Sequence, residues 1–325
     1  MSEAKGALLL GTEDVGKLLK KYATPAIIAM TASSLYNMVD SIFIGQGVGP
    51  LAISGLAITF PFMNLGAAIG AMVGVGASTV TAMELGKKNY AKSCRALANT
   101  IMLNIIFGIL FTVTCLLFLK PILYFFGASD QTLPYAFEYM QVILLGNIIT
   151  HLYHGLNSVL RASGHPNEAM IATIITVIAN IFLDWLFIYP LGMGIRGAAI
   201  ATVLAQTLPL IYLVKIFSNK NELVHFDKKD FVFDIKIIKD ILAIGLSPFL
   251  LNTALCVIII LINKGLKEFG GDLSVGAYGI VNRVTFFFTM IVMGITQGMQ
   301  PIVSYNYGAR QFSRVTEALK KAMFL

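Results

Sequence analysis

Long apolar stretches recur along the chain, and they constrain its fold more than any other feature. A helix needs about 20 mostly apolar residues to cross the hydrocarbon core of a bilayer, and irregular backbone cannot be left facing lipid. Eight stretches meet this requirement, at residues 22–46, 53–83, 95–119, 134–160, 169–190, 196–217, 240–264 and 275–303. The segment Val315 to Leu325 looks like the opening of a ninth. The sequence therefore predicts an all-α fold, a polytopic bundle of transmembrane helices.

The composition agrees with a chain that lies mostly in lipid. Hydrophobic residues make up 57% of the 325 residues and charged residues only 13%, with a mean hydropathy of +0.77. A soluble domain carries about 25% charged residues, because it must cover its surface with polar groups. We therefore predict a membrane protein and not a soluble enzyme, a nucleic-acid binder or a disordered scaffold. The three cysteines show no metal-binding or disulfide spacing.

The distribution of basic residues indicates the orientation. With the N-terminus in the cytoplasm, 19 of the 24 Lys and Arg residues fall in cytoplasmic segments and four on the opposite side, while Arg283 lies within the last span. Lys and Arg collect on the cytoplasmic side of membrane proteins. The net charge of +7 is therefore attributed to these segments and not to an acidic partner. We expect a multi-pass protein of the plasma (inner) membrane with a cytoplasmic N-terminus.

A charged segment divides the chain into two parts. Residues 219–239 mix lysines with acidic residues and are predicted to form a cytoplasmic linker. Residues 1–218 before it are predicted to form a lobe of six transmembrane helices. Residues 240–325 after it are predicted to form a partial second lobe, with two helices and the start of a third.

The sequence also repeats across this linker. An offset of 222 residues aligns residues 51–97 with residues 273–319 and pairs Gly76 with Gly298. A six-helix repeat returns the chain to its starting side, so the two copies share one topology and are related by an axis along the membrane normal. Such a duplication predicts alternating access by rocking of one bundle against the other.

Two of the seventeen acidic residues, Asp40 and Asp184, lie inside predicted spans. A carboxylate in mid-helix costs about 2.5 to 3.5 kcal/mol on insertion scales, so such residues usually serve an ion site, a relay or a pathway. Both lie about 9 Å below the outer ends of their helices, and Thr202 lies at the same depth. Asn180 precedes Asp184 by one helical turn. Such oxygen ligands suit a hard cation, so Asp40 and Asp184 are expected to hold Na+ or, alternatively, a proton.

Other interpretations stay open for the residues around these acids. Asn180 could merely bridge two helices, and Thr202 could bond back to its own helix. Tyr139 lies at a similar depth, and Tyr36 lies one turn before Asp40. Each tyrosine is as readily a packing residue as a member of a site.

Four ordered motifs point to a family. The chain resembles the multidrug and toxin extrusion (MATE) family at YNMVDSIFIGQGVGPLAISGLA, VLRASGHPNEAM, NIFLDWLFIYPLGMGIRGAAIAT and GITQGMQPIVSYNYGA. The resemblance implies two six-helix lobes, the second incomplete in this chain, and export of organic cations and drugs in exchange for Na+ or H+. By position it implies a cation site at Asp40, Asn180, Asp184 and Thr202, and a nearby substrate cleft at Tyr139 and Asn157, to which we add Tyr36.

The sequence thus favours a secondary active transporter that works by alternating access. One alternative is a flippase of lipid-linked precursors from the same superfamily, which is expected to line its cavity with several basic residues, whereas only Arg283 lies within a span. Another is an intramembrane enzyme or receptor, but no paired His-Glu metal helix or Ser/Lys dyad is recognisable. We expect no enzymatic activity, no cofactor besides the coupling ion and no nucleic-acid partner. The expected partners are the lipid bilayer and small organic cations or drugs, bound by a monomer.

Overall fold

Helices form the whole framework of the chain. The computed structural model describes the backbone of residues 5–324, and the side chains of residues 6–255, of 288–324 and of part of the stretch between. In chain order the elements are α1 (Lys5–Leu9), α2 (Val15–Gly47), α3 (Pro50–Gly86), α4 (Tyr90–Leu117), α5 (Leu119–Phe125), α6 (Leu133–Ala162), α7 (Pro166–Ile188), α8 (Gly194–Phe217), the 3-10 turn η1 (Lys228–Asp230), α9 (Ile235–Gly308) and α10 (Phe312–Met323). Residues 5–324 contain no strand, which confirms the predicted all-α fold.

Six helices of the described chain are long and apolar enough to cross a membrane. They are α2, α3, α4, α7, α8 and the first part of α9, Ile235–Leu255. The helix predicted at 134–160 is present as α6, which is not among these six. Its buried residues include Asn147, His151 and Asn157, so α6 carries polar groups into the interior of the bundle.

Local sequence explains where the first long helices begin and end. Asp14 caps α2, because its Oδ1 accepts a hydrogen bond from the backbone N–H of Lys17 at 3.0 Å. Gly49 follows α2 with a φ of 121°, which side-chain-bearing residues rarely adopt. Pro50 then begins α3, where its missing N–H costs no helical hydrogen bond. Since only Val48 and Gly49 separate the two helices, the chain reverses direction there.

The last long helix differs from the prediction. The sequence predicts two separate helices at 240–264 and 275–303, but one helical element runs from Ile235 to Gly308. A straight helix of 74 residues would measure about 111 Å, more than three times the thickness of the hydrocarbon core. The helix must therefore fold back on itself to remain within one membrane.

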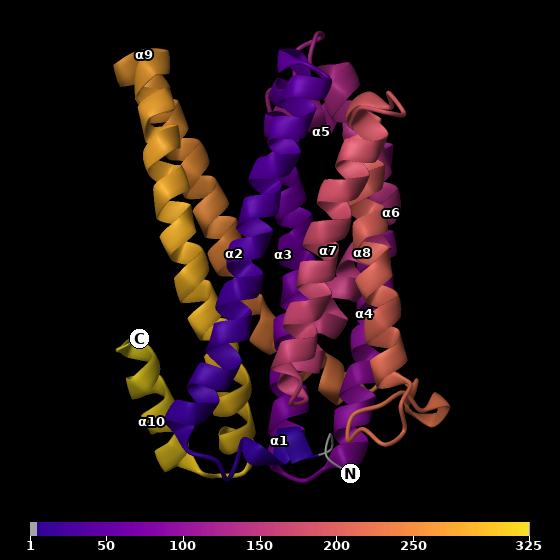
Figure 1. The fold of residues 1–325 in the computed structure, drawn as a ribbon, viewed down its shortest axis with the longest axis vertical. Helices are drawn as coiled ribbons and strands as arrows, with labels where there is room; N and C mark the ends of the chain where they lie inside the picture. The colour runs from indigo at the N-terminus through magenta and orange to yellow at the C-terminus, as the bar shows by residue number, and fades with distance from the viewer. Residues whose placement is uncertain (1–4, 325) are drawn as a thin grey trace.

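Contacts with α3 show this reversal. The Ile241 carbonyl, near the start of α9, packs against Gly76 of α3. Near the other end of α9, Gln300 donates a hydrogen bond to Ser78, which also lies in α3, at 3.0 Å. Two residues far apart in α9 therefore lie at one level of α3. Figure 1 shows the two arms of α9 next to each other at one edge of the bundle.

The returning arm of α9 packs tightly on α2 at the end of the bundle that carries α1 and α10. A Cβ built on Gly294 would lie 2.6 Å from the Cα of Ile27, and one on Gly298 would lie 2.4 Å from the Cα of Ala23. Glycine allows this close approach of two backbones. Toward the opposite end the arms of α9 diverge from α2 (Figure 1). We call the close packing of α9 on α2 and α3 the junction.

Candidate cation site

Asp40 and Asp184 come from different helices and meet inside the bundle. Asp40 lies in the last two turns of α2 and Asp184 in the last two turns of α7, and these two helices pack together. The two carboxyl groups lie close enough to interact directly. Asp184 is 0% exposed and Asp40 is 7% exposed. Two ionisable side chains that are far apart in the sequence thus share one buried position.

The oxygens of these side chains lack hydrogen-bond donors. Neither oxygen of Asp184 has a partner among the described residues, and the same holds for Oδ1 of Asp40. The side-chain oxygen of Asn180, one turn before Asp184, is also buried without a donor in this part of the chain. An unpaired charge in a buried position costs several kcal/mol. These oxygens therefore fit a positive partner, either a metal cation or a proton.

Asn180 and Thr202 connect α7 to α8. The amide Nδ2 of Asn180 donates to the hydroxyl of Thr202 at 3.4 Å, which is a long hydrogen bond. The Thr202 hydroxyl donates to the Ala198 carbonyl of its own helix at 3.1 Å. Asn180 thus bridges two helices and Thr202 bonds back to its own helix. The amide oxygen of Asn180 and one lone pair of the Thr202 hydroxyl nevertheless remain available to a cation.

The donor set that results is made only of oxygens. Two carboxylates, an amide oxygen and a hydroxyl suit a hard cation such as Na+ better than a transition metal, which prefers nitrogen or sulfur ligands. Among the residues that the structure describes, no group of three or more His, Cys, Asp or Glu side chains could hold a metal. Two neighbouring carboxylates can also share one proton, because both cannot ionise easily at short distance. The chemistry of the donor set is compatible with Na+ and with H+.

Two tyrosines accompany the acids. Tyr139 of α6 is 1% exposed, and Tyr36 of α2 is half-buried one turn before Asp40. Both lie near enough to Asp40 and Asp184 to interact electrostatically with them. The structure therefore brings both predicted tyrosines to the acid pair.

Asn157, in contrast, lies elsewhere. It follows Tyr139 along α6 by about 27 Å, at the rise of a regular helix. Its Nδ2 donates to the Ala169 carbonyl of α7 at 2.9 Å, and its Oδ1 accepts from Arg161 at 3.1 Å. Asn157 thus belongs to the end of the bundle near the junction and not to the acid pair.

The sequence did not reveal a polar contact between α6 and α9. Arg161 lies in the last turn of α6 and donates hydrogen bonds to Asn157 and to Gln297 of α9. Gln297 and Gln300 are polar residues one turn apart in an apolar run, and this spacing is the signal that could have identified them. Arg283 is the basic residue within a span that the comparison with a flippase considered. Its side chain lies outside the described residues.

Comparisons with known proteins point to one family. The family model of MatE matches residues 25–186 and 243–325. The chain is 28% identical over 304 residues to "Multidrug export protein MepA" of Staphylococcus haemolyticus (strain JCSC1435) and 27% identical over 306 residues to the MepA protein of Staphylococcus aureus (strain NCTC 8325 / PS 47). Each match covers 94% of this chain and 67% of the relative, so the chain spans about two thirds of the length of these relatives.

Solved structures share the fold over nearly the whole chain. At 28% identity, the TM-score is 0.93 for a MATE in the straight conformation and 0.91 for a MATE in the bent conformation. It is also 0.93 for an outward-facing conformation of a multidrug resistance MATE family transporter of the MOP superfamily. Each superposition covers 99% of this chain. It covers 72% of the chain in the straight conformation and 71% of each of the other two chains.

Proposed function

Because the chain belongs to the MatE family, the multidrug and toxin extrusion transporters, we propose that it serves to export organic cations and drugs in exchange for Na+ or H+. Relatives of the chain are named multidrug export proteins. Since the chain spans about two thirds of their length, the complete activity is proposed for the full-length protein. The observation that carries the proposal is the buried pair of Asp40 and Asp184, whose oxygens lack donors among the described residues.

Competition between positive charges would couple the ion to the drug. A cationic drug and the coupling ion are both attracted by Asp40 and Asp184. In an interior of low dielectric, two positive charges at short distance repel each other strongly, so binding of one favours release of the other. The ring of Tyr36, near Asp40, offers a face on which an organic cation can pack.

Helix α2 would supply the moving part. Pro25 lies within α2 and lacks the N–H that would bond to the Lys21 carbonyl, so the helix bends more easily there. Asp40 lies about 22 Å beyond Pro25, and a change of about 10° at Pro25 would move it by about 4 Å. That displacement is enough to separate Asp40 from Asp184. Relatives with this fold occur in straight and bent conformations.

The packing of α9 supports alternating access. The junction brings α9 against α2 and α3 at the end that carries α1 and α10, while the arms of α9 diverge from α2 at the other end (Figure 1). With a cytoplasmic N-terminus, the protein would be closed toward the cytoplasm and would carry the cation site on the outer side. Opening toward the cytoplasm then requires that the junction separate.

Efflux from vesicles tests the proposal. The full-length protein is reconstituted, and export of a fluorescent organic cation is measured under an imposed Na+ gradient or an imposed pH gradient. Asp40→Asn and Asp184→Asn should each abolish the gradient-driven part of the efflux, because an amide holds neither a proton nor a full negative charge. The gradient that drives the wild-type protein identifies the coupling ion.

The matched control is Asp130→Asn, which changes an exposed acid outside the long helices. This variant should transport like the wild-type protein. Undiminished gradient-driven efflux in both Asp40→Asn and Asp184→Asn would refute the proposed coupling site.

A further inference from the structure

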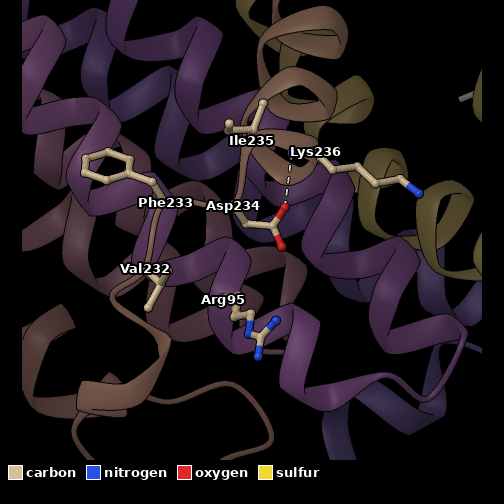
Figure 2. A pocket seen from close by; sticks show the side chains of 6 residues that line it. All are labelled: Arg95, Val232, Phe233, Asp234, Ile235 and Lys236. Carbon is tan, nitrogen blue, oxygen red and sulfur yellow. Dashed lines mark hydrogen bonds between the residues drawn. The ribbon is translucent and has the colours of Figure 1, made fainter.

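A hollow of about 410 Å³ lies where the linker enters α9. It is lined by Arg95 of α4 and by the consecutive residues 232–236. Figure 2 shows Arg95 next to Asp234, with Phe233 on one side of Asp234 and the long side chain of Lys236 extending away on the other. The hollow lies at the starts of α4 and α9, far from the acid pair near the ends of α2 and α7. The proposed transport mechanism gives this hollow no role.

The backbone beside the hollow is fixed by a buried residue. Asn99 of α4 is 0% exposed, and its Nδ2 donates to the Val232 carbonyl at 3.1 Å. Its Oδ1 accepts from the backbone N–H of Asp234 at 3.2 Å. The side chains of Val232, Phe233 and Ile235 nevertheless stay 62%, 56% and 69% exposed. The fold thus holds three apolar side chains outward in fixed positions, which is unfavourable in water.

Two basic side chains, Arg95 and Lys236, lie beside these apolar side chains, together with the acidic side chains of Asp230 and Asp234. Arg95 is half-exposed and forms an ion pair with the buried Asp230, whose Oδ1 lies 3.8 Å from the Nε of Arg95, too far for a hydrogen bond. Lys236 is exposed. Oδ1 of Asp234 accepts hydrogen bonds from the backbone N–H groups of Lys236 and Ile237, both at 3.1 Å, and so caps the start of α9. Asp230 is thus engaged by the ion pair and Asp234 by two backbone N–H groups, whereas the outer N–H groups of Arg95 and the ammonium group of Lys236 remain able to bind an anion.

The hollow lies at the level where a membrane surface is expected. Both α4 and the first part of α9 are candidate membrane spans, and both begin beside it. Arg95 lies about 8 Å along α4 from its start at Tyr90. At this boundary, exposed apolar side chains meet lipid and basic side chains meet phosphate groups.

We propose that the hollow binds the headgroup of an anionic phospholipid. The phosphate group contacts Arg95, and the flexible side chain of Lys236, which extends away from Arg95 in Figure 2, turns toward it. Val232, Phe233 and Ile235 contact the glycerol backbone and the first carbons of the acyl chains. The two cations select an anionic lipid over a zwitterionic one, since the positive group of a zwitterion would be repelled. The site requires only that α4 and α9 span the membrane, and it does not depend on the coupling ion.

Quenching of tryptophan fluorescence by brominated lipids tests this site. The chain has one tryptophan, Trp185, which is 47% exposed and lies in the last turns of α7, away from the hollow. The double variant Phe233→Trp/Trp185→Phe moves the only tryptophan to the hollow. The full-length protein is reconstituted in phosphatidylcholine vesicles that contain equal mole fractions of either dibrominated phosphatidylglycerol or dibrominated phosphatidylcholine.

We expect brominated phosphatidylglycerol to quench the tryptophan at position 233 more strongly than brominated phosphatidylcholine. In the protein with the natural Trp185, the two lipids should quench equally. Adding Arg95→Gln or Lys236→Gln should reduce the preference by about fivefold each, which is the usual effect of one basic side chain at an anionic surface. Lys17→Gln and Lys20→Gln, which remove two exposed lysines of α2, should leave the preference unchanged.

Equal quenching by both lipids at position 233 would overturn the proposed selectivity. Absence of quenching by either lipid would overturn the lipid site itself and would favour a water-soluble partner for these side chains. Because the experiment requires no transport, its outcome is separate from that of the efflux assay.

Discussion

Replacing Arg314 by methionine should loosen the N-terminal segment, residues 6–14, from the helices of the junction. Arg314 of α10 donates hydrogen bonds to the carbonyls of Leu10 at 3.1 Å and Glu13 at 2.6 Å. It also donates from Nε to the side-chain oxygen of Asn306 of α9 at 2.9 Å. One guanidinium group therefore connects the segment to both α9 and α10.

The other side of this segment contacts the loop between α6 and α7. Gly6 packs against the carbonyl of Gly164, in the loop between α6 and α7, and Ala7 and Leu10 are 2% and 0% exposed. The segment thus bridges the two parts of the bundle at the predicted cytoplasmic end. Its attachment to α9 and α10 must break if these parts separate there.

The structure sets the size of the effect. A hydrogen bond from a charged donor contributes about 1.5 to 3 kcal/mol, less where water can replace it. Arg314 is half-buried, and Asn306 keeps its own bond to the Leu10 carbonyl at 2.9 Å. Methionine retains much of the aliphatic volume of arginine. We therefore expect the free energy of opening of the segment to fall by about 2 to 4 kcal/mol.

Amide hydrogen exchange measures this opening. The N–H groups of Thr12 and Glu13 bond to the Leu9 carbonyl at 3.1 and 2.9 Å, so they exchange when the segment opens. A loss of about 2 to 4 kcal/mol corresponds to exchange about 30 to 1,000 times faster. The control, Lys320→Met, changes an exposed lysine of the same helix. Unchanged protection of residues 7–14 in Arg314→Met would refute the reasoning.

Two further predictions concern stability. Burial alone lowers the pKa of His165, but the carboxylate of Glu168, 3.7 Å away, and that of Glu222, hydrogen-bonded at 3.0 Å, raise it above 6.5. This stabilisation is complete below pH 6.5 and is lost as pH rises through the raised pKa, so the melting temperature should fall with pH more steeply than in His165→Gln. A Cβ on Gly76 would lie 1.9 Å from the Ile241 carbonyl, so Gly76→Ala should lower the free energy of unfolding by about 1 to 3 kcal/mol or more, measured by denaturation in detergent.

Each of these predictions has its own check. Parallel curves of melting temperature against pH for the wild-type protein and His165→Gln would show that the histidine contributes no linked stability. For the junction, Gly265→Ala is the control, because a Cβ there would meet nothing within 4 Å. Equal stability of Gly76→Ala and Gly265→Ala would mean that the junction tolerates an added methyl group.

Much of the fold could be predicted because the membrane imposes simple rules on a chain. Apolar length located α3, α7 and α8 to within about three residues of their observed bounds, whereas α2 and α4 begin earlier than predicted, at Val15 and Tyr90. The meeting of Asp40 with Asp184 followed from counting residues back from the helix ends, since each residue rises 1.5 Å. The resemblance implied that Asn157 lies in a cleft near the acid pair, but its observed partners, Ala169 and Arg161, lie at the other end of the bundle.

Features that depend on contacts between distant segments could not be predicted. The sequence does not show that Ile235 to Gly308 form one helical element that folds back on itself. The glycines and charges within this run equally predict a loop between two helices. The contact of Arg161 with Gln297 depends on how α6 and α9 pack. The burial of Ala7 and Leu10 is likewise a result of tertiary packing, since so short an apolar run has no intrinsic preference for the interior.

The central claim is that Asp40 and Asp184 together hold the coupling cation, and infrared difference spectroscopy of the purified full-length protein tests it most directly. We expect a signal from a protonated carboxyl group that disappears when Na+ is added or when pH is raised. The signal should persist in Asp130→Asn and be absent from the double variant Asp40→Asn/Asp184→Asn. Identical cation-induced spectra in the wild-type protein and the double variant would contradict the claim.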